Sequence, residues 1–133
     1  MGASSTSIFD DDDGADWFGD FAEQPGITRI EAAFSVVLTS DDDRYLELPE
    51  CGAAIAAAEV VAALNGKPHP DLYEEIESWV DSHLALLTPR LKAEALKSLE
   101  QIKHESESKD AWMDTPYASD WLEELAALEQ RLR

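Results

Sequence analysis

The sequence predicts an all-α protein: a single compact bundle of five to six short helices around a central Ala-rich helix at about 50–65. Apolar residues recur at helical spacing in several segments, and no segment shows the sustained alternation of a half-buried strand. The chain has 133 residues, enough for one core and too few for two. We therefore expect one helical domain over 1–133.

The central helix is predicted from composition. Residues 52–64 contain seven alanines and one charged side chain, Glu59, so the segment is apolar on most of its circumference. Asn65 and Gly66 are typical of a left-handed cap, and Pro68 prevents the helix from resuming. The apolar run is too short to span a bilayer, which needs about 20 residues. We expect this helix to lie inside the others.

The remaining helices are placed by caps and periodicity. Four aspartates at 10–13 suit a helix N-terminus, where carboxylates accept free backbone N–H groups. Thr28 and Glu31 have the spacing of a capping box, and Thr88-Pro89 is a second start signal. The expected elements are a polar N-terminal arm over 1–9, helices over 12–23, 28–38, 70–86, 89–104 and 116–132, and an irregular segment over 105–115.

The net charge of the chain favours some classes of binding partner and disfavours others. Twenty-nine acidic and ten basic residues give a formal net charge of −19, and no segment of the chain is basic. Direct binding to nucleic acid or to an anionic membrane is therefore not expected, because both need a positive surface. A basic protein or a cation would be attracted instead.

Other sequence signals are few. Cys51 is the only cysteine, so an intramolecular disulfide or a cysteine-based zinc site is excluded. The first residues lack the basic flank and apolar run of a signal peptide, which favours a cytoplasmic location. No glycine-rich phosphate loop, Cys-x-x-Cys or Gly-x-Ser-x-Gly motif occurs, and we expect no cofactor.

Several short motifs together carry a family resemblance. They are Met1-Gly2, Ile8-Phe9-Asp10, Asp13, Ala15-Asp16-Trp17, the alanine-rich 56–64 and the helix that contains Trp121. With them the chain resembles, over nearly its whole length, the bacterial family catalogued as domain of unknown function 4259. Two positions depart from the family pattern: Ser4 replaces a usual Trp, and an Asp replaces a common Asn in the acidic run. The resemblance implies a small acidic cytoplasmic protein of bacterial origin and supplies no catalytic residues.

The aspartates near the N-terminus are a candidate metal site, with Asp11, Asp13, Asp16 and Asp20 as ligands. If Gly14 takes the sixth position of a calcium loop, Asp11, Asp13 and Asp20 fall at positions 3, 5 and 12. Position 1 is then Phe9, which cannot bind a cation. Helix capping with solvated charge is the alternative interpretation.

Glu59 is a second candidate because it lies within the apolar helix. A buried carboxylate needs a partner, and Arg29, Arg44 and Arg90 are the candidates that we consider. Alternatively, Glu59 belongs to an exposed stripe of small residues on the same helix.

A third candidate lies in the aperiodic segment. Trp112, Met113 and Tyr117, bordered by Asp110 and Asp114, have the composition of a protein-interaction site if they face solvent. In the alternative, Trp112 folds back over the core.

Three functional hypotheses follow. The first is a non-enzymatic interaction module that binds a basic partner, in the manner of an immunity-type or DNA-mimic protein. The second is a divalent-cation-binding protein or metal-dependent enzyme that uses the N-terminal aspartates. The third is a homo-oligomer that associates through exposed apolar helix faces.

Overall fold

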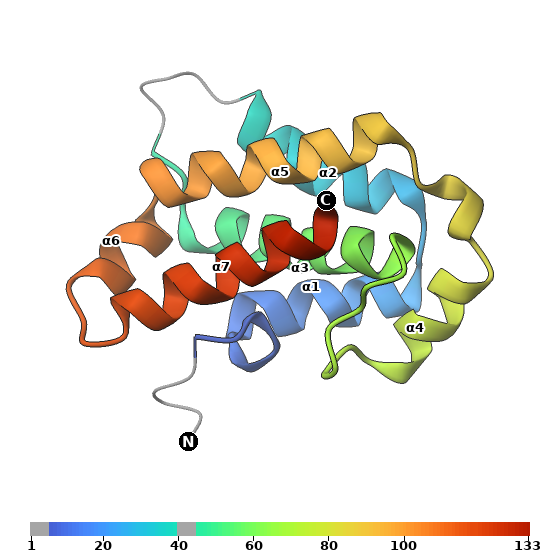
Figure 1. Ribbon diagram of the computed structural model, residues 1–133, viewed down its shortest axis with the longest axis horizontal. Helices are drawn as coiled ribbons and strands as arrows, with labels where there is room; N and C mark the ends of the chain where they lie inside the picture. Colours follow the sequence, from blue (N-terminus) through green and yellow to red (C-terminus); the bar gives the residue numbers. More distant parts are fainter. Residues whose placement is uncertain (1–5, 40–44) are drawn as a thin grey trace.

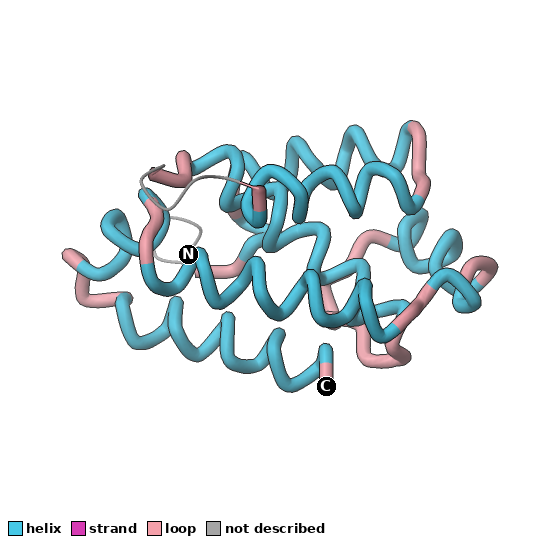
Figure 2. Tube along the Cα trace, turned by 90° about the horizontal axis from the view of Figure 1, so that it is seen from above, coloured by secondary structure: helices cyan, strands magenta, loops and turns pink. Residues whose placement is uncertain are grey.

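The computed structural model describes residues 6–39 and 45–133, and this part of the chain is an all-α bundle, as predicted (Figure 1). Its elements are η2 (Ile8–Asp10), α1 (Asp12–Glu23), α2 (Ile27–Leu38), α3 (Leu48–Leu64), α4 (Glu74–Asp81), η3 (Leu84–Leu86), α5 (Pro89–His104), α6 (Glu107–Met113) and α7 (Ala118–Leu132). Viewed from above, the helices lie in successive layers (Figure 2). None of the helices in the described ranges is long and apolar enough to cross a membrane.

Helix α3 is the centre of the bundle. It contacts α1, α2, α4, α5, α6 and α7, and every residue from Cys51 to Leu64 is buried except the half-buried Ala53. Alanine side chains let the neighbouring helices approach closely on all sides, while Val60, Val61 and Leu64 supply larger apolar surface. The prediction that the alanine-rich helix lies inside the others is confirmed.

Both ends of α3 have defined caps. At its start, Glu47 and Glu50 form a reciprocal capping box, with the Glu47 N–H donating to Glu50 Oε1 at 3.0 Å. At its end, Gly66 has a φ of 81°, the left-handed conformation that glycine adopts without steric penalty. The helix is therefore fixed in length by local sequence at both ends.

Two glycines allow close packing near the start of the chain: Gly14 lets Ile8 lie against α1, and Gly52 lets α1 lie against α3. A Cβ at Gly14 would overlap the Ile8 carbonyl oxygen, and a Cβ at Gly52 would lie 2.7 Å from the Asp13 Cβ. Ile8 is buried in the core as a result. The expected polar arm over 1–9 thus contains an apolar anchor, while residues 1–5 lie outside the described part.

Two predicted helices differ from the structure, those expected over 28–38 and over 70–86. Helix α2 begins after Gly26 without a side-chain cap, so Thr28 and Glu31 lie within its first turns and form no capping box. The single helix expected over 70–86 is divided into α4 and η3. Helix α4 begins only at Glu74, after the extended N-cap Tyr73, because three acids in its first turn complement the positive end of the helix dipole.

The segment 105–115 is largely helical, and we correct the expectation that it is irregular. Ser106 caps α6: its Oγ accepts from the Lys109 N–H at 3.0 Å and donates to the Ile102 carbonyl at 2.7 Å. The Glu107 N–H donates to the Leu46 carbonyl at 2.8 Å. A helix of seven residues is too short to be stable alone, so these contacts hold it in place.

Candidate functional site

A cavity of about 250 Å³ lies where the first turn of the chain meets α3, α6 and α7. Its lining residues are Thr6, Ser7, Ile8, Asp10, Asp11, Asp12, Gly52, Ile55, Glu59, Ser108, Trp112, Trp121, Glu124, Leu125 and Leu128. We refer to it as the acidic pocket. Residues more than 100 positions apart in sequence meet here, which is why no local motif marks it.

Carboxylates dominate the polar lining of the acidic pocket. They are Asp10, Asp11, Asp12, Glu59 and Glu124, and the described lining contains no Lys, Arg or His. Such a concentration of one sign of charge in a concavity with apolar walls focuses the negative potential. The acidic pocket is therefore suited to attract a positively charged group.

The start of α1 positions three of these carboxylates. Asp11 is the N-cap, and its Oδ2 accepts a hydrogen bond from the Gly14 N–H at 3.0 Å. Asp12 is the first helical residue, and Asp10 ends the preceding η2 turn. The free N–H groups and dipole of the helix stabilise acids at this position. The aspartate run is thus explained locally by capping, and tertiary packing turns it towards the cavity.

The same crowding affects Asp13, which is half-buried beside the acidic pocket. Partial burial raises the pKa of the Asp13 carboxyl, and the negative charges of Asp11, Asp16, Asp12 and Glu107 raise this pKa further. Partial burial is the main cause of the shift, and the neighbouring carboxylates at the start of α1 act in the same direction.

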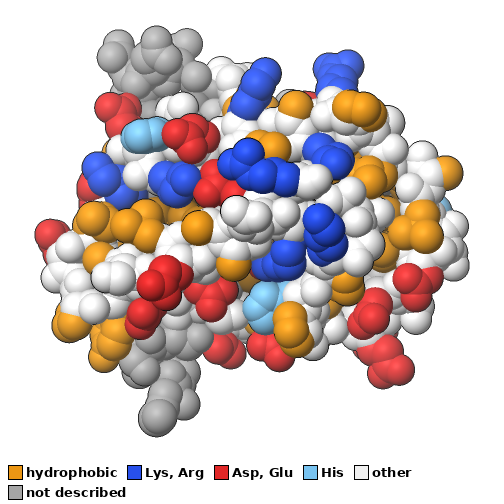
Figure 3. Space-filling view, viewed as in Figure 1, with side chains coloured by type: hydrophobic (Ala, Val, Ile, Leu, Met, Phe, Trp, Pro, Cys, Tyr) orange, Lys and Arg blue, Asp and Glu red, His pale blue; other side chains and the backbone are white. Residues whose placement is uncertain are grey.

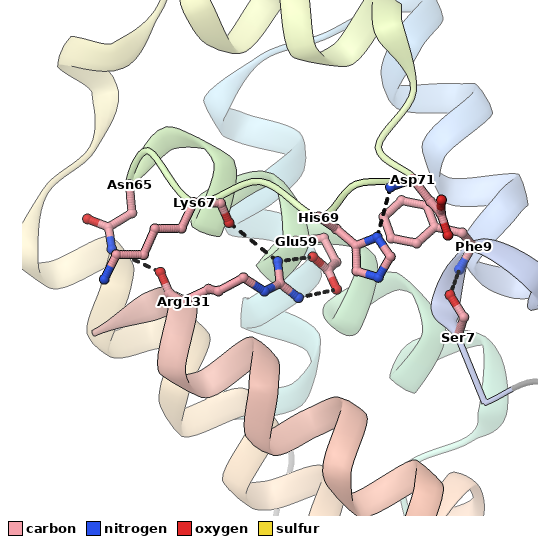
Figure 4. Close-up of polar contacts among 8 residues, drawn as sticks. All are labelled: Ser7, Phe9, Glu59, Asn65, Lys67, His69, Asp71 and Arg131. Atoms are coloured by element: carbon pink, nitrogen blue, oxygen red, sulfur yellow. Dashed lines mark hydrogen bonds and ion pairs between the residues drawn. The ribbon is translucent and has the colours of Figure 1, made fainter.

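Glu59 lines the acidic pocket. Its carboxylate is ion-paired (Figure 4). The Arg131 guanidinium donates two hydrogen bonds to it, Nη1 to Oε1 at 2.8 Å and Nη2 to Oε2 at 3.1 Å. The Glu59 side chain is only 4% exposed. Arg131 also donates to the Lys67 carbonyl at 3.4 Å, and Asn65 Nδ2 donates to the Arg131 carbonyl at 2.9 Å. Glu59 is therefore buried and ion-paired with Arg131, and neither Arg29 nor Arg90 is its partner, while Arg44 lies outside the described residues.

Apolar side chains form the rest of the wall. Trp121 is buried and Trp112 is half-buried, and both are packed with the core. Ile8, Ile55, Leu125 and Leu128 complete the apolar lining. An aromatic and aliphatic wall beside carboxylates can hold both the stem and the charged head of a long basic side chain.

Helix α6, which carries Trp112, is tied to the segment before α3. The Leu48 N–H donates to Glu107 Oε1 at 2.8 Å, and the Tyr45 hydroxyl donates to the Asp110 carboxylate. The hydrogen bond to Asp110 raises the pKa of Tyr45 to about 12. These contacts fix the position of Trp112 relative to α3.

The family model described as "Domain of unknown function (DUF4259)" matches residues 2–124, nearly the whole chain. The chain belongs to the DUF4259 family. This confirms the resemblance drawn from the sequence. No curated protein and no solved structure shows significant similarity to the chain.

In this DUF4259 protein the four predicted metal ligands have different roles and surroundings. Asp11 caps α1 and lines the acidic pocket, Asp13 is half-buried, and Asp16 and Asp20 are exposed along α1. Within the described ranges, no group of three or more His, Cys, Asp or Glu side chains is arranged to hold a metal ion. The geometry gives the metal hypothesis no support.

The five residues of the predicted interaction patch differ in exposure. Trp112 and Tyr117 are half-buried, Met113 is 44% exposed, and Asp110 and Asp114 are exposed. Of the five residues, only Trp112 lines the acidic pocket. Sequence reasoning missed Trp121, Glu124 and Ser108 as pocket residues, because in the local sequence each resembles ordinary helix packing or a solvated face.

Cys51 does not belong to the site. It is buried, and burial raises the pKa of its thiol, so the protonated and unreactive form is favoured at neutral pH.

Proposed function

We propose that the protein is a binding module that receives a lysine or arginine side chain of a basic partner protein in the acidic pocket. The observation that carries this proposal is the set of carboxylates around one concavity, Asp10, Asp11, Asp12 and Glu124 beside the Glu59 that Arg131 already neutralises, with no basic residue in the described lining. The partner belongs to the class of basic proteins that immunity-type or DNA-mimic proteins bind.

The size of the acidic pocket favours a side chain over a larger ligand. Its volume of about 250 Å³ is below the roughly 300–1,000 Å³ of sites for drug-sized molecules. Trp112 and Trp121 add polarisable aromatic surface, which attracts cations. The net charge of −19 would accelerate encounter with a basic partner at low salt.

The test compares two double variants that remove the same charge. Asp12→Asn with Glu124→Gln neutralises two pocket carboxylates, whereas Glu31→Gln with Asp81→Asn neutralises two exposed acids outside the pocket. Binding of a fluorescein-labelled lysine- and arginine-rich peptide is followed by anisotropy. We expect the pocket variant to bind at least about tenfold more weakly, because hydrogen bonds to charged groups are lost.

The control variant should change affinity by less than about twofold, because it alters only the net charge. Circular dichroism checks that both variants are folded. Equal weakening by the two variants would show that the peptide responds to overall charge alone and would refute the proposal. Saturable binding of Ca²⁺ or Mg²⁺ that displaces the peptide would favour the cation-binding alternative.

A further inference from the structure

A second concavity, of about 430 Å³, lies where the start of α5 meets the end of α7. Its lining residues are Leu87, Thr88, Pro89, Lys92, Ala93, Leu96, Leu132 and Arg133. None of them belongs to the acidic pocket. We call it the α5–α7 groove.

The α5–α7 groove is shallow and mainly apolar. Leu132 is its only buried lining residue, and Leu87, Lys92 and Leu96 are half-buried. The other four lining residues are exposed. A surface of this kind suits side chains laid across it by another polypeptide, whereas a hydrocarbon tail needs an enclosing pocket.

The charged side chains of the α5–α7 groove are both basic. Lys92 and Arg133 line it, and no Asp or Glu does. In the described part of the chain, neither cation takes part in an ion pair, whereas Arg90, Lys103 and Arg131 all pair with glutamates. Figure 3 shows Lys and Arg side chains gathered over this face of the molecule. With 29 acids and ten bases in the chain, a groove whose charged side chains are both basic departs from the overall charge of the molecule.

We infer that the α5–α7 groove binds an acidic amphipathic peptide segment of a partner protein. Apolar side chains of the segment would contact Leu87, Leu96 and Leu132, and its carboxylates would pair with Lys92 and Arg133. Charge complementarity selects this occupant, because a basic segment would meet two cations here. The Debye length of about 8 Å at physiological salt lets nearby cations outweigh the distant acids of the rest of the surface.

The experiment uses the full chain and a fluorescein-labelled helical peptide with leucines on one face and glutamates elsewhere. We expect saturable binding in the sub-millimolar range. The Lys92→Glu, Arg133→Glu double variant should bind at least about tenfold more weakly, because two charge-assisted contacts become repulsive. Ala93→Trp, which fills the groove from an exposed position, should weaken binding without changing the net charge.

The matched control is Lys67→Glu with Lys97→Glu, which makes the same charge change at exposed positions outside the groove and should retain most of the affinity. Equal loss in the control, or no saturation, would overturn the inference. Binding of decanoate without binding of the peptide would also overturn the inference, because the occupant would then be a lipid acid. A dimer in sedimentation that Lys92→Glu dissociates would overturn it too, because the occupant would then be a second copy of the chain. The acidic-pocket variants do not touch this groove, so this test and that of the proposed function can fail separately.

Discussion

Glu59 remains buried because Arg131 satisfies both of its carboxylate oxygens. The pair joins α3 to α7 through two parallel N–H···O bonds, and the guanidinium makes a third contact with the Lys67 carbonyl. Without Arg131, the carboxylate would keep its desolvation penalty and lose its compensation. The pair also neutralises one of the five acids that line the acidic pocket.

Arg131→Met should therefore destabilise the fold by about 3 kcal/mol, because it leaves a buried charge unpaired. Lys103→Met is the matched comparison, because it breaks the 2.8 Å ion pair between Lys103 and Glu129 that joins α5 to α7. This pair is more exposed than the Glu59–Arg131 pair, so its loss should cost about 1 kcal/mol or less. Urea denaturation measures both. Adding Glu59→Gln should recover part of the loss in Arg131→Met, and equal losses in the two single variants would contradict the argument.

Tyr45 gives a second prediction for a single residue, in alkaline solution. Its phenol should titrate near pH 12, because the hydrogen bond to Asp110 favours the protonated form. Asp110→Asn should return the pKa to about 10. Since the folded-state pKa is raised, the stabilising effect of this contact is complete below pH 10 and is lost as pH rises through 12.

Ultraviolet difference titration of the phenolate at about 295 nm measures the pKa of Tyr45, with Tyr117→Phe and Tyr73→Phe backgrounds to isolate its signal. A single tyrosine transition near pH 10 in the unsubstituted protein would disprove the contact.

Among the helices, the approach of α1 to α3 depends on glycine. Gly52→Ala should destabilise the protein by about 1–3 kcal/mol, because the new Cβ would lie 2.7 Å from Asp13 Cβ and overpacking exceeds the gain in helix propensity. Gly19→Ala is the control: Gly19 is also helical, a methyl group there would have no neighbouring atom within 4 Å, and the change should stabilise by about 0.5–1 kcal/mol.

If the packing is as described, chemical denaturation will show that the free energy of unfolding falls in Gly52→Ala and rises in Gly19→Ala. Stabilisation by Gly52→Ala would show that α1 does not lie so close to α3.

The helices whose signals are local could be predicted from the sequence, and those that depend on distant contacts could not. Helix α1 begins at Asp12 and ends at Glu23 as expected, because its cap and its apolar stripe lie within the same segment. Helix α6 was not predicted because it is stabilised by contacts outside its own segment. The Leu46 carbonyl accepts a hydrogen bond from the helix, and the buried hydroxyl of the cap Ser106 donates to the Ile102 carbonyl. A segment of seven residues is too short for its periodicity to reveal a helix.

Over the molecule as a whole, acids and bases are unevenly placed. The segment 6–28 has seven acids and no base, and it supplies the outer side of the acidic pocket. Helix α5 carries Arg90, Lys92, Lys97 and Lys103, and Arg131 and Arg133 lie at the end of α7 beside it. The molecule therefore presents two concave surfaces of opposite charge despite its net charge of −19.

The excess of acids predicts a response to salt. Raising NaCl from about 10 mM to about 300 mM should increase Tm by a few degrees, because screening weakens repulsion among acids more than it weakens the few buried pairs. Differential scanning calorimetry measures Tm, and glucose at matched osmolality controls for general solute effects. An unchanged or lower Tm at high salt would contradict this expectation.

Local sequence was enough to specify the helical class, the central alanine-rich helix and the acidic start of α1, because composition, periodicity and caps act within one segment. It also indicated the family that the matching model then confirmed. Three arrangements came from the packing of distant segments: Arg131 pairs with Glu59, Asp10 to Asp12 share a concavity with Trp121 and Glu124, and unpaired cations border the α5–α7 groove. Each of them joins residues from separate helices, and the way helices pack is not encoded in any one segment of the chain.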